Sequence, residues 1–352
     1  MNRPSAALQP LPPRAHEHAG SAKTSPALQV SVVVPTYKRP QLLQRCLRAL
    51  AAQSLPRADF EVIVVDDGHS DSTQRVVSLA AAQWPPGRLR YLRPLQGRGP
   101  AVARNCGWSA ARAPLVAFTD DDTLPSPDWL AQGVRAMHAN GYVAIGGRVV
   151  VPRSETNRPP SDHERMTRGL ETSRFVTANA FVRRNALTQV HGFDERFRRA
   201  WREDSDLEFR LERHAGPVGR CEDAVVLHPV REEPWGISLR QQKNVYFDAL
   251  LYRKHPRLYR QRVRRTPPWD YYAIVVLTLG ALAAVLAGRP LAAGVAGALV
   301  LALVLRFALH RLQGASHSPR HVAEMLVTSA LIPYLSVAWR LRGAWHFKTW
   351  FL

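Results

Sequence analysis

The sequence predicts an α/β fold with a mostly parallel central sheet, followed by transmembrane or interfacial helices at the C-terminus. Three observations lead to this prediction. Short β-branched runs alternate with helical segments over residues 29–122, the connections between them are short, and long apolar stretches follow residue 270. Alternating strands and helices with short connections are typical of parallel sheets. A chain of 352 residues also has ample length for a packed core.

The predicted elements follow one another along the first part of the chain. QVSVVVPTY, a β-branched run closed by a proline, predicts a buried strand at Gln29–Tyr37, and apolar residues at helical spacing predict a helix from Pro40. FEVIVVDDG at Phe60–Gly68 predicts a second buried strand, and the helix after it has Asp71 or Ser72 as its cap. The same reasoning predicts a third strand, a third helix and a fourth strand in LRYLRP (89–94), GPAVARNCGWSAAR (99–112) and APLVAFTDDD (113–122).

Composition narrows the classes of protein to which the chain can belong. The formal net charge is +20, so we expect an anionic partner such as a nucleotide or an anionic lipid. The three cysteines are far apart and form no CxxC pair, which argues for a reducing compartment and against a disulfide scaffold or a structural zinc site. Residues 1–28 are rich in proline and alanine, contain no apolar signal-peptide core, and are predicted to form a disordered tail.

Polar and charged residues follow three of the predicted strands. Residues 36–39 follow the first strand, Asp66 and Asp67 the second, and Asp120–Asp122 the fourth. In parallel sheets ligands bind at the carboxyl ends of the strands, so we expect these residues to face one crevice. Adjacent carboxylates repel one another unless a cation compensates, and Mg²⁺ or Mn²⁺ takes oxygen ligands and holds phosphates. The three acids therefore predict either a metal site or, as an alternative, a solvated acidic turn.

The chain becomes basic and then apolar towards its C-terminus. Arg253–Arg265 contains seven Lys/Arg and no acidic residue. Two uncharged stretches, Tyr271–Ala287 and Leu291–Leu305, are separated by a short Gly-Arg-Pro turn and predict a transmembrane hairpin at 271–305. The alternative is a helical hairpin buried in a soluble domain. A third apolar stretch, Val322–Trp339, has basic residues on both sides, which favours a position in the membrane interface over a span.

These features divide the chain into four parts. They are the tail at 1–28, an α/β domain at 29–235, a basic juxtamembrane segment at 236–268 and a membrane region at 269–352. The basic segment is expected to lie against anionic lipid headgroups, because cytoplasmic leaflets attract such clusters. This arrangement places the α/β domain on the cytoplasmic side of a cell membrane that the chain crosses more than once.

Six segments of the α/β domain carry a resemblance to a known family. They are VSVVVPTYKRP, VIVVDDGHSD, GPAVARNCGWSAARAPLVAFTDDD, TANAFVRRNAL, HGFDERF and EDSDLEFRL. In order and spacing they resemble the family 2 inverting glycosyltransferases with the GT-A (nucleotide-diphospho-sugar transferase) fold, from about Gln29 to Pro229. The resemblance implies transfer of a sugar from a nucleotide-sugar, assisted by Mg²⁺ or Mn²⁺.

The resemblance also implies a role for individual residues on the donor side. The residues expected to bind the nucleotide-sugar are Pro35, Thr36, Tyr37, Arg39, Asp67, Arg104, Asp120 and Asn179. Asp122 is the expected direct metal ligand, Asp120 would reach the sugar or ribose and also the metal, and His228 would touch the metal or the diphosphate. For Arg104 the alternative is an arginine on a helix surface, and for His228 it is a structural histidine.

On the acceptor side the resemblance implies a carboxylate base. An inverting transfer needs one group to take the proton of the acceptor hydroxyl as it attacks the anomeric carbon. Asp204 matches that position, with Glu203 as a positioning residue or as the alternative base. Asp206 and Glu208 are expected to be charges on the face of the helix. Without the family context, the whole stretch Trp201–His214 would be interpreted as a charged amphipathic helix.

The expected function is therefore that of a membrane-anchored glycosyltransferase acting on a lipid-linked or membrane-adjacent acceptor, of unknown oligomeric state. Nucleotidyl transfer is less consistent, because the first strand is followed by PTYKRP rather than a glycine-rich phosphate loop. A processive polysaccharide synthase is an alternative, although LRQQKNVYF only partly resembles the motif of processive relatives. A non-enzymatic protein that binds nucleic acid or anionic surfaces is disfavoured, because the strand-end carboxylates would repel phosphates. We therefore expect no nucleic-acid partner.

Overall fold

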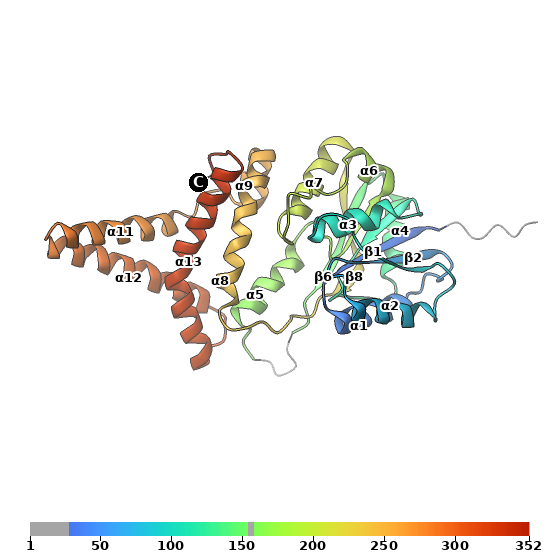
Figure 1. Ribbon diagram of the computed structural model, residues 1–352, viewed down its shortest axis with the longest axis horizontal. Coiled ribbons are helices and arrows are strands. Elements are labelled where there is room, and N and C mark those ends of the chain that lie inside the picture. Colours follow the sequence, from blue (N-terminus) through green and yellow to red (C-terminus); the bar gives the residue numbers. More distant parts are fainter. Residues whose placement is uncertain (1–27, 154–157, 352) are drawn as a thin grey trace, which may run out of the picture.

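The computed structural model describes residues 28–153 and 158–351, so the predicted tail, apart from its last residue, lies outside the described residues. A sheet with helices on both sides occupies one end of the molecule, and a region made of helices alone occupies the other (Figure 1). The helical region ends in a hairpin that projects away from the sheet.

The central sheet is mixed. Its strands are β1 (Val30–Thr36), β2 (Phe60–Asp66), β3 (Leu89–Leu92), β4 (Leu115–Phe118), β5 (Leu124–Pro125), β6 (Ala144–Val150), β7 (Ala180–Arg183) and β8 (Val218–Leu227). They lie in the order β3-β2-β1-β4-β7-β6-β8-β5. The four strands predicted from sequence pair in parallel. The other half departs from a parallel sheet, because β7 is antiparallel to both of its neighbours and β5 is antiparallel to β8.

The register of the parallel half brings the predicted site residues to one edge. Thr36 at the end of β1 pairs with Asp66 at the end of β2. Val33 of β1 pairs with Phe118, the last residue of β4, so the loop that begins at Thr119 lies beside the end of β1. The three strand ends with polar residues therefore meet, as the sequence predicted.

Helices cover both faces of the sheet. They are α1 (Pro40–Ala51), α2 (Asp71–Ala81), α3 (Pro100–Ser109), α4 (Trp129–Ala139), α5 (Asp162–Arg168), α6 (Arg184–Gln189) and α7 (Glu203–His214), with a 3₁₀ turn, η1, at Gly169–Thr172. One apolar core packs α1, α2 and α4 against alternate residues of β1 and β2. A second core packs α3, α6 and α7 against the opposite face. Because strand side chains alternate between faces, the fully apolar strands supply both cores.

The C-terminal part is entirely helical within the described residues. Its elements are α8 (Ile237–Gln241), η2 (Gln242–Asn244), α9 (Val245–Lys254), α10 (Pro256–Leu258), a π-helical turn η3 (Tyr259–Val263), α11 (Trp269–Leu286), α12 (Pro290–Leu312) and α13 (Pro319–His346). Three of these helices, α11, α12 and α13, are long and apolar enough to cross a membrane. Gly288, with φ of 66°, makes the tight turn between α11 and α12.

The hairpin and the last helix differ in their surroundings. α11 and α12 expose nearly all of their apolar side chains, which excludes the alternative of a hairpin buried in a soluble domain. By contrast, 39% of the most apolar stretch of α13 is buried inside the protein. α13 runs across the base of the hairpin, beside α9 (Figure 1).

A third apolar core joins the sheet domain to the C-terminal helices. It contains Phe197 and Phe209 from the sheet domain, Phe247 and Leu250 from α9, and Phe347 beyond α13. The basic juxtamembrane segment is therefore packed against the sheet domain and is not a free linker.

Candidate active site

The middle acid of the strand-end cluster is a structural residue. Asp121 is fully buried, and its carboxylate accepts a hydrogen bond of 2.7 Å from the Thr36 hydroxyl. Arg39 lies 2.8 Å from its other oxygen. Burial raises the pKa of Asp121 to about 7, and Arg39 and Thr36 oppose that rise. Asp121 thus ties the loop to the end of β1, which leaves its two neighbours to face the crevice.

Asp120, Asp122 and His228 form a cluster in which one ligand atom from each residue lies within 4.8 Å of the others. Asp122 is 8% exposed, so a solvated acidic turn does not fit this geometry. The Nδ1 atom of His228 is buried and has no hydrogen-bond partner among the described residues. Two carboxylates and one imidazole are a suitable donor set for a divalent ion such as Mn²⁺. The residues present therefore fit the predicted metal site.

Two arginines hold Asp122 in place. Arg39 Nη1 lies 3.3 Å and Arg231 Nε 3.1 Å from Asp122 Oδ2. A pocket of about 370 Å³ lies beside Asp122, between α1 and residues 229–232. Arg231 was not predicted from the sequence, because nothing in its local sequence distinguishes it from the many other arginines of the chain.

The two acids after β2 have different surroundings. Asp66 accepts hydrogen bonds from Gly68 N, Ser70 N and the Tyr91 hydroxyl, so it stabilises the turn. Asp67 accepts one bond of 2.9 Å from Gly99 N through Oδ2, while its Oδ1 is buried without a partner in the part of the chain that the structure describes. A buried acceptor without a donor is costly, so Asp67 Oδ1 is available to a ligand N–H or hydroxyl.

The remaining predicted nucleotide residues lie at the end of β1. Pro35 is half-buried within the strand, whereas Tyr37 beyond it is 49% exposed. Lys38 lies with its amine 5.6 Å from the centre of the Tyr37 ring. Tyr37 therefore presents an aromatic face next to the crevice, on which a base could stack.

A buried arginine joins the metal cluster to the predicted base. Arg104 is 3% exposed and donates to Asp120 Oδ1 at 3.0 Å and to Glu203 Oε1 at 2.9 Å. Arg104 is thus not on a helix surface. Burial would raise the pKa of Asp120, but Arg104 and His228 hold that pKa below its usual value. Burial and the neighbouring Asp204 raise the pKa of Glu203 to about 8, against the effect of Arg104.

Asp204 is the more exposed member of the predicted acid pair. It is half-buried, and its carboxylate accepts hydrogen bonds from Thr177 N at 3.2 Å and Thr177 Oγ1 at 2.7 Å. Burial raises its pKa, and Arg104 and Thr177 oppose the rise. Glu203, which is 2% exposed, points into the protein towards Arg104. Thr177 was not singled out from the sequence, although it lies two residues before Asn179.

Asn179 departs from its predicted role. It is fully buried, and its amide nitrogen donates to the carbonyl oxygens of Arg148 and Ala224. Its Oδ1 accepts a bond of 2.8 Å from Trp129 Nε1. These contacts tie the start of β7 to β6, β8 and α4, so a direct contact between Asn179 and the sugar does not fit this geometry.

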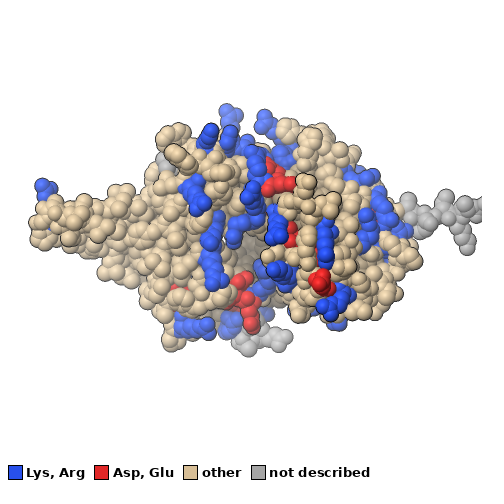
Figure 2. All heavy atoms as spheres, in the orientation of Figure 1, with Lys and Arg blue, Asp and Glu red and all other residues tan. Residues whose placement is uncertain are grey.

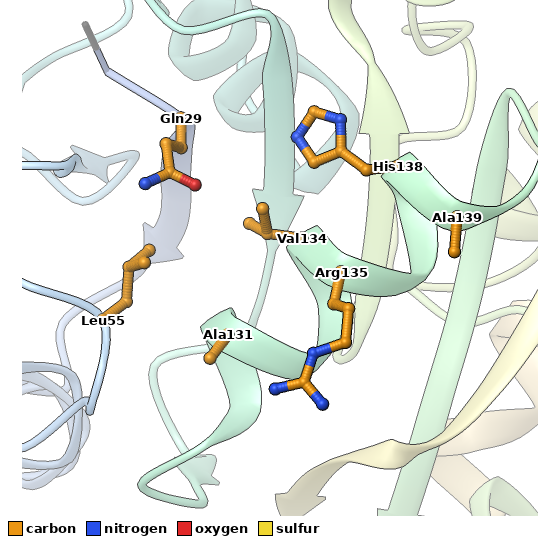
Figure 3. A pocket seen from close by; sticks show the side chains of 7 residues that line it. All are labelled: Gln29, Leu55, Ala131, Val134, Arg135, His138 and Ala139. Carbon is orange, nitrogen blue, oxygen red and sulfur yellow. The ribbon is translucent and has the colours of Figure 1, made fainter.

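The surface has a hollow near the predicted site and a second pocket away from it. Figure 2 shows a hollow between the sheet domain and the helical region, with Lys and Arg along its sides and acidic atoms within it. A second pocket of about 550 Å³ lies by the amino end of β1 and along α4 (Figure 3). Its lining contains Gln29, Arg135 and His138 but no carboxylate, and it is at the opposite end of β1 from Thr36. That pocket is therefore separate from the predicted site.

Comparisons with known proteins found similar sequences within one enzyme family. A family model described as "Glycosyl transferase family 2" matches residues 31–202. Glycosyltransferase AglE of Haloferax volcanii is 27% identical over 226 residues, which cover 61% of this chain and 71% of AglE. Validoxylamine A glucosyltransferase of Streptomyces hygroscopicus subsp. jinggangensis is 32% identical over 259 residues, covering 62% of this chain and just over half (57%) of that relative.

A solved structure shares the fold. A mannosyltransferase from Pyrobaculum calidifontis, in complex with GDP-Man and Mn²⁺, matches with a TM-score of 0.55 and 21% sequence identity, covering 91% of this chain and 88% of that one. At this identity the likeness establishes the architecture, including the GT-A-like sheet and its flanking helices. The family match includes the strand-end acids and ends one residue before Glu203.

Proposed function

Because this chain belongs to the family 2 glycosyltransferases, we propose that it transfers a single sugar from a nucleotide-sugar to a hydroxyl group of a lipid-linked or membrane-adjacent acceptor. The observation that carries the proposal is the buried Arg104, which touches Asp120 of the metal cluster and Glu203 of the acid pair. Through this residue the groups suited to a leaving diphosphate and the groups suited to a proton transfer lie in one connected network.

On the donor side, the proposal assigns the nucleotide to the end of β1. Asp67 Oδ1 would accept from the base or the ribose, and the exposed ring of Tyr37 would stack on the base. Asp120, Asp122 and His228 would hold Mg²⁺ or Mn²⁺, and the related fold that binds GDP-Man and Mn²⁺ supports this assignment. Such an ion supplies positive charge at the diphosphate that leaves.

On the acceptor side, the proposal assigns Asp204 as the base. Asp204 is the more exposed of the two acids, and Thr177 orients its carboxylate with two hydrogen bonds. The acceptor hydroxyl would give its proton to Asp204 while its oxygen attacks the anomeric carbon from the side opposite the diphosphate, which inverts the configuration. Glu203 would keep Arg104 in place rather than take the proton, because it is buried and bonded to that arginine.

The C-terminal helices support a proposed membrane arrangement. α11 and α12 would cross the bilayer as a hairpin, while α13 would lie in the cytoplasmic interface. One face of α13 is packed on the chain, and Glu324 on it accepts a 2.7 Å hydrogen bond from Gly236 N, just before α8. The exposed apolar residues of α13 recur at helical spacing and are Leu326, Val327, Leu331, Leu335, Leu341 and Trp345. A helix with one apolar exposed face and one packed face suits the plane of an interface.

This arrangement would hold the donor crevice near lipid-borne acceptors and place nearby basic residues at anionic headgroups. The direct test is to purify the full-length protein in detergent and to measure transfer from a panel of nucleotide-sugars, with Mn²⁺ or Mg²⁺, to extracted membrane lipids. We expect one donor to give nucleoside diphosphate and a glycosylated lipid. Failure of every donor, with protein that binds nucleotide, would refute the proposed transfer.

A further inference from the structure

One buried carboxylate of α9 holds the turn that precedes the acid pair. Asp248 is 5% exposed. Its Oδ1 accepts from Trp201 Nε1 at 2.9 Å and from Arg202 Nε at 2.6 Å, and its Oδ2 accepts from the Tyr259 hydroxyl at 3.2 Å. A buried carboxylate is stable only when its oxygens are paired in this way. Two of the three donors belong to the residues directly before Glu203.

The turn held by Asp248 has an uncommon backbone conformation. Arg202 has φ of 76°, in the left-handed region that non-glycine residues rarely adopt. Its guanidinium also stacks on the Trp201 ring at 4.5 Å. Such a conformation persists only when the surroundings enforce it. Because α7 begins at the next residue, this turn sets the direction in which Glu203 and Asp204 point.

The juxtamembrane segment also forms ion pairs with later residues of α7. Asp206, which is fully buried, is 3.0 Å from His255 and 2.6 Å from Lys254. Arg262 reaches Glu212 at 2.7 Å. The sequence suggested that acids such as Asp206 are charges on a helix face and that the basic segment lies on lipid. In the structure Asp206 is buried, and Lys254, His255 and Arg262 of the basic segment pair with acids of α7.

On its other side, α9 is packed against α13. A Cβ atom at Gly343 of α13 would lie 2.5 Å from the carbonyl oxygen of Tyr246 and 3.2 Å from Ala249 Cβ. The Arg253 side chain donates a 2.7 Å bond to the Phe347 carbonyl. Figure 1 shows α9 between α13 and the sheet domain. The helix with an exposed apolar face and the helix that carries the acid pair therefore contact the same short element.

We propose that Asp248 is a positioning residue, through which α9 and the membrane-facing helix α13 together fix the geometry of the acid pair. This inference rests on the proposed function. It predicts that the link affects the chemical step and leaves donor binding unchanged. In the part of the chain that the structure describes, the groups that donate to Asp248 come from Trp201, Arg202 and Tyr259, not from the ends of β1, β2 and β4. The packing of α13 on α9 would thus be required for full activity.

The test uses the full-length protein in detergent with Asp248→Ala, Asp248→Asn and Gly343→Leu. The matched control is Asp270→Asn, which removes a carboxylate that is 65% exposed and pairs with Arg306. We expect Asp248→Ala to lower kcat by about 100-fold, the effect of a misplacement of about 1 Å. Asp248→Asn should lower it less, since its oxygen still accepts from Trp201 and Arg202. Gly343→Leu should also lower kcat, and the donor KM should stay constant throughout.

Hydrogen exchange supplies a readout that does not depend on transfer. In Asp248→Ala the Asp206 amide, which donates to the Arg202 carbonyl at 2.9 Å, should exchange faster than in the wild type. The amides of β1 in Asp248→Ala, and the amides of the Asp270→Asn protein, should exchange as in the wild type. Wild-type kcat in Asp248→Ala, or an equal loosening of β1, would overturn the inference. Wild-type kcat in Gly343→Leu would overturn the part that involves α13.

Two results need a second measurement: a variant that does not fold, and a wild type that shows no turnover. If Asp248→Ala does not fold, Trp201→Phe removes a single donor to Asp248 and should lower kcat several-fold at constant donor KM, whereas an unchanged kcat would contradict the inference. If the wild type turns over no nucleotide-sugar, the proposed function fails. The exchange comparison still decides whether Asp248 positions the turn.

Discussion

Replacing Arg104 with methionine removes the buried cation that joins Asp120 to Glu203 but keeps most of the side-chain volume. Both carboxylates then lose a hydrogen-bonded partner at 2.9–3.0 Å. Removing one partner of a buried pair costs about 3–5 kcal/mol, because the remaining charge is left without compensation. At pH 8.5, where Glu203 of the wild type is mostly ionised, we expect a loss of about 3 kcal/mol, which corresponds to a fall of roughly 6–12 °C in Tm.

The sign of the pH dependence follows from the pKa of Glu203. Burial already raises that pKa to about 8, and loss of Arg104 would raise it further. A carboxyl with a raised folded pKa is stabilised below its unfolded value and loses that stability as pH rises through the folded pKa. The penalty of Arg104→Met should therefore be smaller at pH 6, where Glu203 is protonated with or without Arg104, than at pH 8.5, by up to about 1 kcal/mol.

Thermal unfolding in detergent at the two pH values measures this effect. The control is Arg158→Met, because Arg158 pairs with Glu164 while its side chain is 53% exposed, and such pairs contribute less than about 1 kcal/mol. An Arg104→Met protein as stable as Arg158→Met, or one with the same loss at both pH values, would refute the reasoning about the buried network.

Three other predictions concern the metal, the base and the membrane. Asp122→Asn should abolish turnover while leaving the fold intact, and EDTA should silence the wild type reversibly; full activity in excess EDTA would contradict a metal-assisted transfer. Asp204→Asn should lower kcat by about 1,000-fold at unchanged donor affinity. In the wild type, the pKa that limits kcat/KM at low pH should lie above the usual carboxyl range, because burial raises the pKa of Asp204. An inactive Glu203→Gln beside an active Asp204→Asn would exchange their roles. The full chain should resist a carbonate wash and a cysteine placed at position 289 should be labelled only from the far side, so release by carbonate would rule out a spanning hairpin.

Local signals in the sequence were enough to predict the frame of the molecule. The apolar runs at β1, β2 and β4 are buried strands in the structure, and the polar and charged residues that follow them meet at one edge. The apolar stretches that predicted the hairpin form α11 and α12. These features depend on residues close together in the chain, so periodicity and composition reveal them.

Only the tertiary structure gave the physical reason why neighbouring charged residues differ. The motifs singled out Asp67, Asp120 and Asp122, but periodicity and composition do not show that Asp66 stabilises a turn or that Asp121 is buried against Thr36. Arg104 and Glu203 are 99 residues apart in sequence. Asp248 of α9 and Arg202, the residue before α7, are 46 residues apart. A buried charge is tolerated only where a partner arrives from another element, and that meeting is set by how strands and helices pack rather than by the residues next to it in the chain.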